Sequence, residues 1–404
     1  MSRLPIRYFI IHEFAAMKKR FTLSLLIVLT SFAVWGQENN LLPLEELEYY
    51  QLYTSLEEAL ADKENVLRLS LTNQDLSYLP KELYQLDKLQ ELRLNGNKLK
   101  SYPDSLKLLT GLQVLDLSWT GMEKLPAVVG QMTQLRKLDL SDNGFDAFPD
   151  QLFALENLAV LKFERNHISV VPPDIQKFKN LRILSLWLNN ISTLPPEMGN
   201  LVALEELNVA NNKLTGLPDS LMNCQNMRIM LLWDNQLTEL PDSIHKLYSL
   251  EKLEFNDNAI KTLPPSLCQI QYLMELRLSN NQVETLPENI GDMEFLVNLD
   301  ISRNKLKSIP TGIKGCQSLE VLKLWDNKLK DVPQEITELK YLKELDLGYN
   351  PIPAERIEAL RKQMPDTKIL HLRKPPQAVL DSLNRQDTLK QPQPETPNSP
   401  QPNE

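Results

Sequence analysis

A proline recurs every 23 residues through most of this chain, and no insertion or deletion interrupts the series. The members are Pro80, Pro103, Pro126, Pro149, Pro172, Pro195, Pro218, Pro241, Pro264, Pro287, Pro310 and Pro333. A fixed period in the twenties is typical of a solenoid, because one short repeat cannot bury its own apolar side and must stack on its neighbours. The sequence therefore predicts one elongated repeat domain with a regular, curved face.

The repeated unit has its own apolar spacing, which the segment from Leu89 to Gly111 illustrates. The shared pattern is L-x-x-L-x-L-x-x-N-x-L-x-x-L-P-x-x-L-x-x-L-x-x. Leucines at positions 4 and 6 alternate with polar residues, as in a β-strand, whereas the later leucines are three apart and fit a helical or extended back wall. Units start at residues 66, 89, 112, 135, 158, 181, 204, 227, 250, 273, 296 and 319, and a divergent thirteenth starts at Leu342.

This pattern resembles the leucine-rich repeat in its short form with an internal Leu-Pro, similar to the repeats of Ras-suppressor-class proteins. The resemblance covers residues 66–372. It implies an α/β solenoid, a right-handed horseshoe of about thirteen units with a parallel β-sheet on its concave face.

Position 9 of the unit is asparagine in eleven of the thirteen units. These residues are Asn97, Asn143, Asn166, Asn189, Asn212, Asn235, Asn258, Asn281, Asn304, Asn327 and Asn350, and the exceptions are Gln74 and Thr120. A carboxamide can both donate to and accept from backbone groups that a buried turn leaves unpaired. We therefore expect a structural ladder rather than a row of metal or glycan ligands, and the resemblance implies the same.

The start of the chain has the layout of a secretory signal peptide, with Lys18-Lys19-Arg20 ahead of an apolar run from Phe21 to Trp35. The run has 15 residues, short for a membrane span of about 20. We predict a signal peptide over residues 1–36, with Met17 as a possible true start, and therefore an exported, periplasmic or secreted protein without stable membrane insertion after cleavage. An uncleaved membrane anchor is the alternative.

The two ends of the solenoid are expected to be capped. Residues 37–65 form the predicted N-terminal capping region, in which Ser55 to Glu58 has the pattern of a capping box ahead of a short helix. At the other end, residues 354–363 are expected to be helical and 369–372 to form a last strand. Residues 373–404 are rich in Pro, Gln and Asn and are predicted to be a disordered tail.

Three cysteines follow the predicted signal peptide. Cys224 and Cys316 occupy position 21 and are expected in the core, whereas Cys268 is expected to be exposed. They lie at least two units apart, too far for a disulfide. Cysteine-rich caps are absent, which together with the signal peptide suggests a bacterial envelope or secreted form.

Charge and residue content argue against several functions. The formal charge is −9, and residues 1–36 carry five basic and one acidic residue, so their removal would leave −13. An acidic surface disfavours nucleic acid as a partner. The histidines His167, His245 and His371 fall in different units without metal-ligand spacing, so we expect no metal and no cofactor. Acidic pairs such as Asp139 and Asp142 are expected to be solvated surface carboxylates, and we predict no enzyme.

The concave face carries the strongest functional signal. Positions 3, 5, 7 and 8 should point to the inner curve or its rim, where most residues are polar. The exceptions are the predicted ligand-binding residues, which include every tryptophan after Trp35: Trp119, Val160, Ile183, Trp187, Leu188, Ile229, Leu231, Trp233 and Trp325. We expect one apolar platform with charges at its margin, contributed by Lys137, Lys162, Glu164 and Arg165.

Exposed aromatic anchors beside aliphatic side chains are typical of a surface that binds a protein or peptide. Trp233-Asp234 and Trp325-Asp326 also suit a glycan, through stacking and hydrogen bonding. A protein or peptide partner is the first hypothesis for this non-catalytic binding module, and a glycan of the cell envelope is the second. Structural packing of tryptophan along the loop rim is the alternative to both.

Overall fold

The structure is a computed structural model that describes residues 41–372. The predicted signal peptide and the predicted tail lie outside the described residues, as do the first four residues of the predicted capping region. The chain divides into two compact units at Tyr49–Tyr50. The described part of the first unit contains one short helix, α2 (Leu44–Leu47), which follows Pro43 and carries Glu45 and Glu46 in its first turn.

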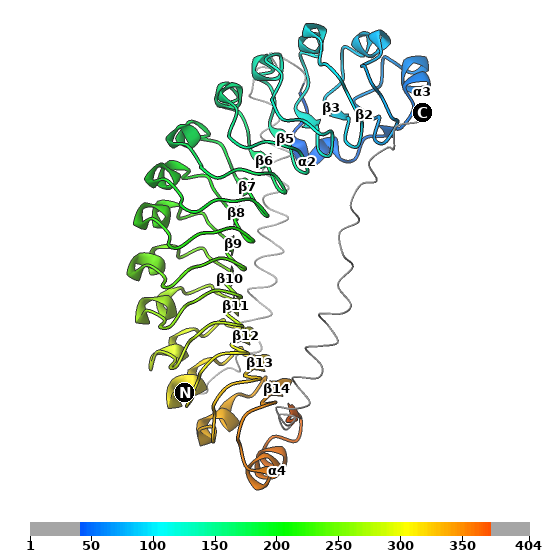
Figure 1. Ribbon diagram of the computed structural model, residues 1–404. Helices are drawn as coiled ribbons and strands as arrows, with labels where there is room; N and C mark the ends of the chain where they lie inside the picture. Colours follow the sequence, from blue (N-terminus) through cyan, green and yellow to red (C-terminus); the bar gives the residue numbers. More distant parts are fainter. Residues whose placement is uncertain (1–40, 373–404) are drawn as a thin grey trace, which may run out of the picture. The chain divides into compact units, whose positions relative to one another are not determined.

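The second unit is built on one parallel sheet of fifteen strands that lie in the order of the sequence (Figure 1). The strands are β1 (Leu52–Tyr53), β2 (Arg68–Ser70), β3 (Glu91–Arg93), β4 (Val114–Asp116), β5 (Lys137–Asp139), β6 (Val160–Lys162), β7 (Ile183–Ser185), β8 (Glu206–Asn208), β9 (Ile229–Leu231), β10 (Lys252–Glu254), β11 (Glu275–Arg277), β12 (Asn298–Asp300), β13 (Val321–Lys323), β14 (Glu344–Asp346) and β15 (Lys368–Leu370). Strands β2 to β14 belong to the thirteen predicted units. The sheet lines the inner curve, which confirms the predicted leucine-rich repeat horseshoe.

Each unit strand occupies positions 3 to 5, and its central residue, a leucine in all of them except β9 with Met230, faces the core. In β7, for example, Leu184 pairs in register with Leu161 of β6 and with Leu207 of β8, and all three are fully buried. Burying a leucine contributes about 1.5–3 kcal/mol. The alternation of buried leucine and outward residue is the period of a strand, so the predicted register is confirmed.

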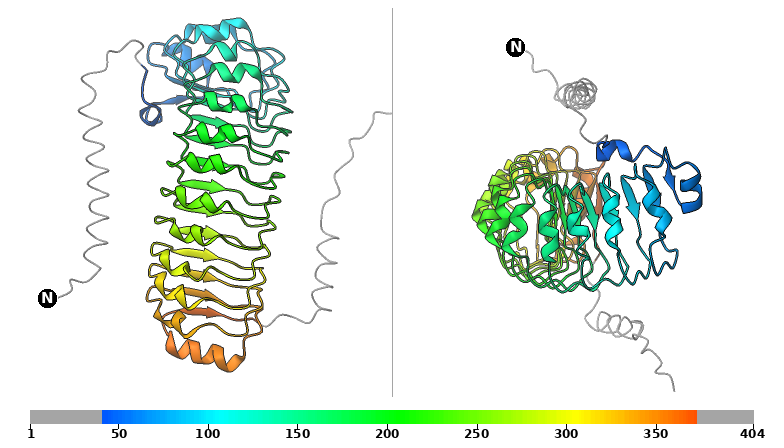
Figure 2. Two further views of the ribbon diagram at one scale, coloured as in Figure 1. Left: turned by 90° about the vertical axis from the view of Figure 1, so that its left-hand side faces the viewer. Right: turned by 90° about the horizontal axis from the view of Figure 1, so that it is seen from above.

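The back wall consists of short 3-10 helices on the convex side (Figure 2). They are η1 (Lys81–Gln85), η2 (Asp104–Leu108), η3 (Val129–Gln131), η4 (Asp150–Ala154), η5 (Pro173–Lys177), η6 (Pro196–Asn200), η7 (Asp219–Asn223), η8 (Asp242–Lys246), η9 (Pro265–Gln269), η10 (Ile290–Asp292), η11 (Thr311–Gly315) and η12 (Gln334–Glu338). In ten of the twelve, the recurring proline is the residue just before the helix, where its extended backbone and missing N–H are compatible with a helix start.

The asparagine ladder is structural, as expected. The Asn97 side chain donates from Nδ2 to the carbonyl oxygens of Leu71 and Leu94 at 2.7 and 2.8 Å. Its Oδ1 accepts from the backbone N–H groups of Gln74 and Leu76 at 3.1 and 2.9 Å. One buried side chain therefore satisfies four backbone groups in two adjacent units.

Both ends have the expected helices. At the N-terminal end, α3 (Leu56–Ala61) begins after Ser55, whose Oγ accepts from the Glu58 N–H at 3.4 Å. Strand β1 pairs with β2 and extends the sheet beyond the predicted units. At the C-terminal end lie α4 (Ala354–Gln363) and β15 (Figure 2).

The prediction that Cys268 is exposed is wrong, because Cys268 is buried like Cys224 and Cys316. Cys268 lies at position 19, within η9, and Gly199 and Met222 occupy the same position in η6 and η7 and are also buried. Successive 3-10 helices pack closely at this position, where a Cβ on Gly199 would lie 2.2 Å from the Ser220 carbonyl oxygen. Burial raises the pKa of all three thiols to about 12.

Candidate functional site

Most of the concave face is polar, and part of it is occupied by ion pairs. On β10 and β11, Lys252 lies 2.9 Å from Glu254 and 3.6 Å from Glu275, and Arg277 contacts the same two carboxylates at 3.2 and 2.5 Å. These four side chains form one cluster of ion pairs. They border the apolar region on its C-terminal side.

The apolar region lies on β6 to β9, and we call it the concave patch. Its members are Val160, Ile183, Trp187, Ala210, Ile229, Leu231 and Trp233. Apart from Ala210, which is fully buried, they are half-buried rather than exposed, because neighbours on adjacent strands cover part of each side chain. Strand β8 places Glu206 between Ile183 and Ile229, so the expected single platform is interrupted at position 3.

At position 7, Trp187 and Trp233 continue the apolar surface across the unit that lies between them. Their ring centroids lie 6.4 Å apart with planes tilted by 48°, although the residues are two units apart along the sheet. The intervening residue at this position is Ala210, which is fully buried. Two strand spacings amount to about 9.6 Å, so the rings can approach each other only because the side chain between them is small.

Two polar atoms of this patch lack a hydrogen-bond partner among the described residues. They are Nε1 of Trp187 and Oγ of Ser185, the last residue of β7, two positions before Trp187. Both atoms are buried, and a buried donor without an acceptor costs about 1–3 kcal/mol.

Arginine and aspartate lie beside the tryptophan pair. The Arg165 guanidinium carbon lies 5.8 Å from the centre of the Trp187 ring, within the range of a cation–π contact. Arg165 Nε also donates to Asp142 Oδ1 at 2.5 Å. Arg165, a member of the predicted charged margin, therefore contacts the tryptophan pair.

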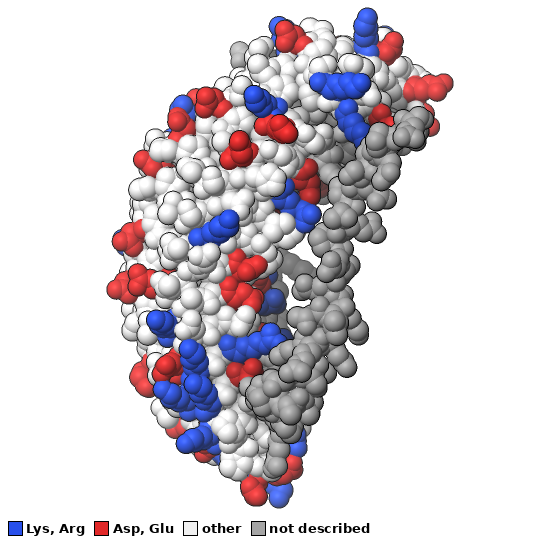
Figure 3. All heavy atoms as spheres, viewed as in Figure 1, with Lys and Arg blue, Asp and Glu red and all other residues white. Residues whose placement is uncertain are grey.

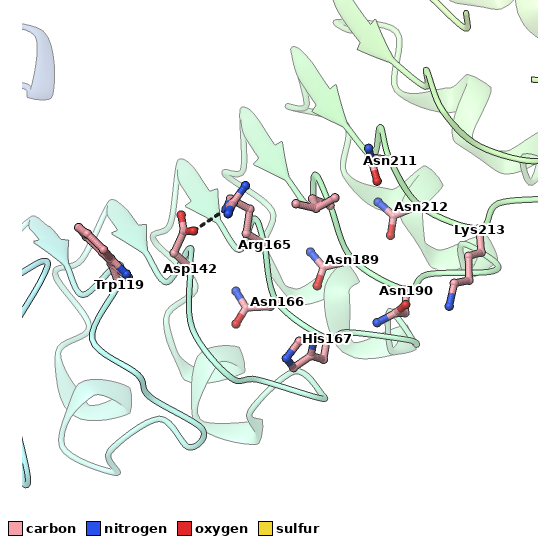
Figure 4. A pocket seen from close by; sticks show the side chains of 11 residues that line it. Trp119, Asp142, Arg165, Asn166, His167, Asn189, Asn190, Asn211, Asn212 and Lys213 are labelled. Carbon is pink, nitrogen blue, oxygen red and sulfur yellow. Dashed lines mark hydrogen bonds and ion pairs between the residues drawn. The ribbon is translucent and has the colours of Figure 1, made fainter. Parts of the chain in front are cut away.

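An open groove of about 580 Å³ runs along the adjoining rim (Figure 4). It is lined by residues at positions 8 to 10 of successive units: Trp119, Asp142, Arg165, Asn166, His167, Leu188, Asn189, Asn190, Asn211, Asn212 and Lys213. Trp119 lies at one end and Lys213 at the other, and amide groups line the middle. Asn166, Asn189 and Asn212 belong to the ladder, so their amide nitrogens are committed to backbone carbonyls.

Position 8 has a left-handed backbone in every unit, with φ between +50° and +72°. Eight units place Asn, Asp or Gly there, which tolerate this conformation. The other five place larger residues there: Trp119, Arg165, Leu188, Arg303 and Tyr349. Each of these is a tryptophan or lies next to one, in sequence or in ring contact. Strain of this kind persists where the side chain has a role that outweighs its cost.

The structure separates the predicted site residues into three groups. The concave patch holds the contacting Trp187 and Trp233, then Ile229 and Leu231 of β9 and, on the other side of Glu206, the paired Val160 and Ile183. Trp119 and Leu188 line the groove. Trp325 stands apart, four units beyond Trp233. It packs on Gly348, stacks with Tyr349 at 5.4 Å and lies 4.6 Å from the Arg303 guanidinium carbon.

Sequence reasoning did not find the groove residues Asp142, His167, Asn190, Asn211 and Lys213 as a set. All of them lie at positions 8 and 10, so a column-by-column alignment of the units would have grouped them. Their amide and charged character gives no signal in an apolar pattern. The sequence therefore identified the tryptophans but missed the polar surface between Trp119 and the patch.

Acid–base and metal chemistry gain little support from the described residues. Burial raises the pKa of Asp139, although hydrogen bonds from Ser141 oppose this, whereas Asp142 is paired with Arg165. Within residues 41–372 no cluster of three or more His, Cys, Asp or Glu side chains could hold a metal ion. Nor does this part of the chain contain a helix long and apolar enough to cross a membrane. On the face seen in Figure 3, acidic and basic side chains lie close together over much of the surface.

A curved parallel sheet with a 23-residue unit and an asparagine ladder defines a repeat scaffold, and comparisons with known proteins identify which one. Two family models match, a leucine-rich repeat region over residues 218–305 and a leucine rich repeat over residues 179–237 and 294–352. The chain is a leucine-rich repeat protein. Proteins of this family commonly serve as non-catalytic binding scaffolds.

Solved structures show the same fold. A leucine-rich repeat protein of Leptospira interrogans is 29% identical, with 79% of this chain and 99% of that chain covered and a TM-score of 0.51. The plant peptide hormone receptor RGFR1, in complex with RGF2, is 26% identical over 80% of this chain and 53% of its own, with a TM-score of 0.63. An internalin of Listeria monocytogenes, 20% identical over 78% and 91% of the two chains, shares the fold with a TM-score of 0.67. No curated protein sequence matches the chain.

Proposed function

We propose that this protein is a non-catalytic module that binds a protein or peptide through the concave patch, with Trp187 and Trp233 as anchors. The observation that carries the proposal is the tryptophan pair over Ala210, which is flanked by aliphatic side chains on an otherwise polar face. Tryptophan is among the residue types that most often dominate the energy of protein interfaces.

The concave patch suits an extended peptide whose side chains contact the rings of Trp187 and Trp233. The plant receptor that shares this fold was solved with a peptide hormone, and the Toll protein of Drosophila, 23% identical, was solved with Spatzle. These relatives support a protein or peptide as the class of ligand.

A glycan is the second candidate ligand, and the amide-lined groove is the observation that favours it. Exposed Trp119 offers a stacking surface at one end of the groove, and Asn190, Asn211 and Lys213 offer polar groups towards its other end. The tryptophan–aspartate pairs give weaker support, because Asn235 and Asn327 beside them are committed to the ladder. The mixed charges seen in Figure 3 and the acidic composition support a partner other than nucleic acid.

A paired selection tests the class of ligand. A random peptide library displayed on phage is selected on the purified protein, and the same protein is applied to a glycan array. We expect the selection to enrich peptides with an aromatic or large aliphatic residue that bind the wild type and not the Trp187→Ala/Trp233→Ala variant. Glycan binding that is lost in Trp119→Ala, without peptide enrichment, would support the glycan instead.

We also propose that the protein is exported after cleavage behind Gly36, in a bacterial secreted or envelope form. The supporting observation is the basic segment Lys18-Lys19-Arg20 ahead of the apolar run from Phe21 to Trp35. Intact mass of the exported protein tests this proposal. A membrane-bound form that keeps residues 17–36 would contradict it.

A further inference from the structure

A second apolar surface lies on the opposite rim of the solenoid, formed by residues that lie one to four positions before a strand. Among residues 41–372, thirteen large apolar side chains are strongly exposed, and six of them lie on this one rim. They are Val202, Tyr248, Tyr272, Met274, Phe295 and Tyr341. This concentration is unlike the single exposed apolar residues of an ordinary surface, and it lies away from the concave patch.

Elsewhere the same rim carries a ladder of charges at position 2 of the unit. Arg182 pairs with Glu205 at 2.8 Å, and Arg228 pairs with Glu251 at 2.9 Å. Further along, Lys343 pairs with Glu320 at 2.7 Å.

Met274 and Val297 interrupt this ladder at its centre, beside Tyr272 and Phe295. The rings of Tyr272 and Phe295 lie 6.1 Å apart. The rim therefore has an apolar centre with charged pairs on both sides, which is the anatomy of a protein interface.

The position 2 residues are stacked in strict register. The Met274 N–H donates to the Glu251 carbonyl at 2.8 Å, and the Val297 N–H donates to the Met274 carbonyl at 2.8 Å. Each step along the rim is therefore one strand spacing, about 4.8 Å. Residues equally many units before and after Met274 lie at equal distances from it.

The position 2 residues on the two sides of Met274 have complementary charges. Arg228 lies two units before Met274 and Glu320 two units after it, so their charges are opposite. Three units away the same holds for Glu205 and Lys343.

The exposed apolar residues match as well. Tyr248 lies beside the unit before Met274, and Phe295 lies beside the unit after it. Val202 and Tyr341 lie beside the units three before and three after. Every strongly exposed apolar residue of this rim thus has an apolar counterpart or lies at the centre.

We propose that two copies of this chain pair antiparallel through this rim, around a two-fold axis close to Met274. A two-fold interface brings each residue against its counterpart on the other copy. Arg228 of one copy then faces Glu320 of the other, Glu205 faces Lys343, Tyr248 faces Phe295, and Tyr272 and Met274 contact their own equivalents.

Geometry permits this pairing over a useful length. Six steps separate the row of Val202 from the row of Tyr341, about 29 Å along the rim. Glu251 faces Val297 of the second copy and keeps its own pair with Arg228. The two concave faces would open to the same side, so a ligand with two binding segments could engage both. The pairing does not depend on the proposed function of the concave patch.

The first test is the mass of the protein in solution, measured by light scattering after gel filtration and by sedimentation at micromolar concentrations. We expect twice the mass of the chain for the wild type. Tyr272→Glu, which places a charge at the centre, should weaken the dimer at least tenfold. Exposed Tyr78→Glu, far from this rim, is the matched control and should leave the dimer unchanged.

The second test fixes the antiparallel register. Arg228→Glu and Glu320→Arg should each weaken their own homodimer, because two like-charge contacts form in each. An equimolar mixture of the two variants should recover a heterodimer, because opposite charges then meet at both places.

A cross-link tests the position of the axis. Met274→Cys should cross-link to itself through a short bis-maleimide, whereas Arg182→Cys, four units away, should not. The native thiols are buried and do not interfere. A monomer at these concentrations, a dimer insensitive to Tyr272→Glu, or equal cross-linking of the two cysteine variants would overturn the proposal.

Discussion

At the scale of single residues, Ala210 decides how the concave patch is assembled. Ala210 occupies position 7 of the unit between the two tryptophans. Because its side chain is small and buried, rings from units two apart meet with their centroids 6.4 Å apart. A larger side chain would separate the rings and fill the space that an anchor of the ligand would use. The shape of the patch therefore depends on a residue that itself offers almost no contact surface.

Ala210→Leu is expected to destabilise the fold by about 1–3 kcal/mol through overpacking, and to weaken ligand binding. Urea unfolding and the affinity for a selected peptide measure the two effects. Ala210→Ser changes the volume little and serves as the control. Unchanged binding by Ala210→Leu would mean that the approach of the two rings does not matter for recognition.

At position 8, a large side chain that serves ligand binding is expected to lower the stability of the fold, because the backbone there is left-handed. Trp119 has φ of +54° and is 68% exposed, so its side chain gains little from packing while its backbone is strained. Trp119→Asn should raise the free energy of unfolding by about 1 kcal/mol, because asparagine tolerates this conformation. The reciprocal change Asp257→Trp, at the same position, should lower it by a similar amount. A loss of stability in Trp119→Asn would show that the indole is structural.

Glu91 links stability to pH near the N-terminal end. Burial raises the pKa of Glu91, but hydrogen bonds and charge from Arg68 and Arg93 outweigh burial, so the pKa lies below its usual value of 4.5. A lowered folded-state pKa stabilises the fold above pH 4.5, and this stabilisation is lost as the pH falls through the folded-state pKa.

Glu91→Gln should therefore cost about 2 kcal/mol at pH 7, because Arg68 stays buried without a carboxylate. The difference from wild type should shrink in urea unfolding at progressively lower pH, below 4.5. The control is Glu358→Gln on the exposed face of α4, where Glu358 pairs with Arg361. This variant should change stability little at pH 7 or at lower pH. A difference for Glu91→Gln that does not change with pH would contradict the assigned pairing.

At the scale of structural elements, the asparagine ladder makes each unit depend on its neighbours. Asn235 donates to the carbonyls of Val209 and Leu232, and its Oδ1 accepts from the Leu214 N–H. Two consecutive turns are therefore joined by one side chain. Each strand also pairs in register with its neighbours. A shift of one residue would turn the buried side chains of that strand to the other face of the sheet.

A glycine inserted after Lys213 should destabilise the protein strongly, because it separates the Asn212 turn from Leu214, whose N–H reaches Asn235. Asn235→Ala, which leaves buried carbonyls unpaired, should lower the free energy of unfolding by about 1–3 kcal/mol per lost hydrogen bond. The effect of the insertion is compared with the effect of this variant. Urea unfolding followed by circular dichroism measures both variants. Full stability of the insertion variant would refute the idea of one continuous core.

At the scale of the whole molecule, the sequence predicted what depends on spacing within a unit. The strands, the ladder, the buried Cys224 and Cys316, and the helix at residues 354–363 all follow from the position of a residue in its own repeat. The burial of Cys268 and the meeting of Trp187 with Trp233 depend instead on which residue occupies the same position in the neighbouring unit. So does the exposed rim around Met274. The apolar pattern of one unit contains no such information.

The central claim is that the tryptophan pair on the concave patch binds a ligand and is not structural padding. The double variant Trp187→Ala/Trp233→Ala tests it most directly, with thermal melting by circular dichroism compared against affinity for a peptide selected on the wild type. We predict a melting temperature close to wild type and binding weaker by several kcal/mol, whereas Trp325→Ala, with its separate stack, should keep its affinity. A lower melting temperature with binding retained would contradict the claim.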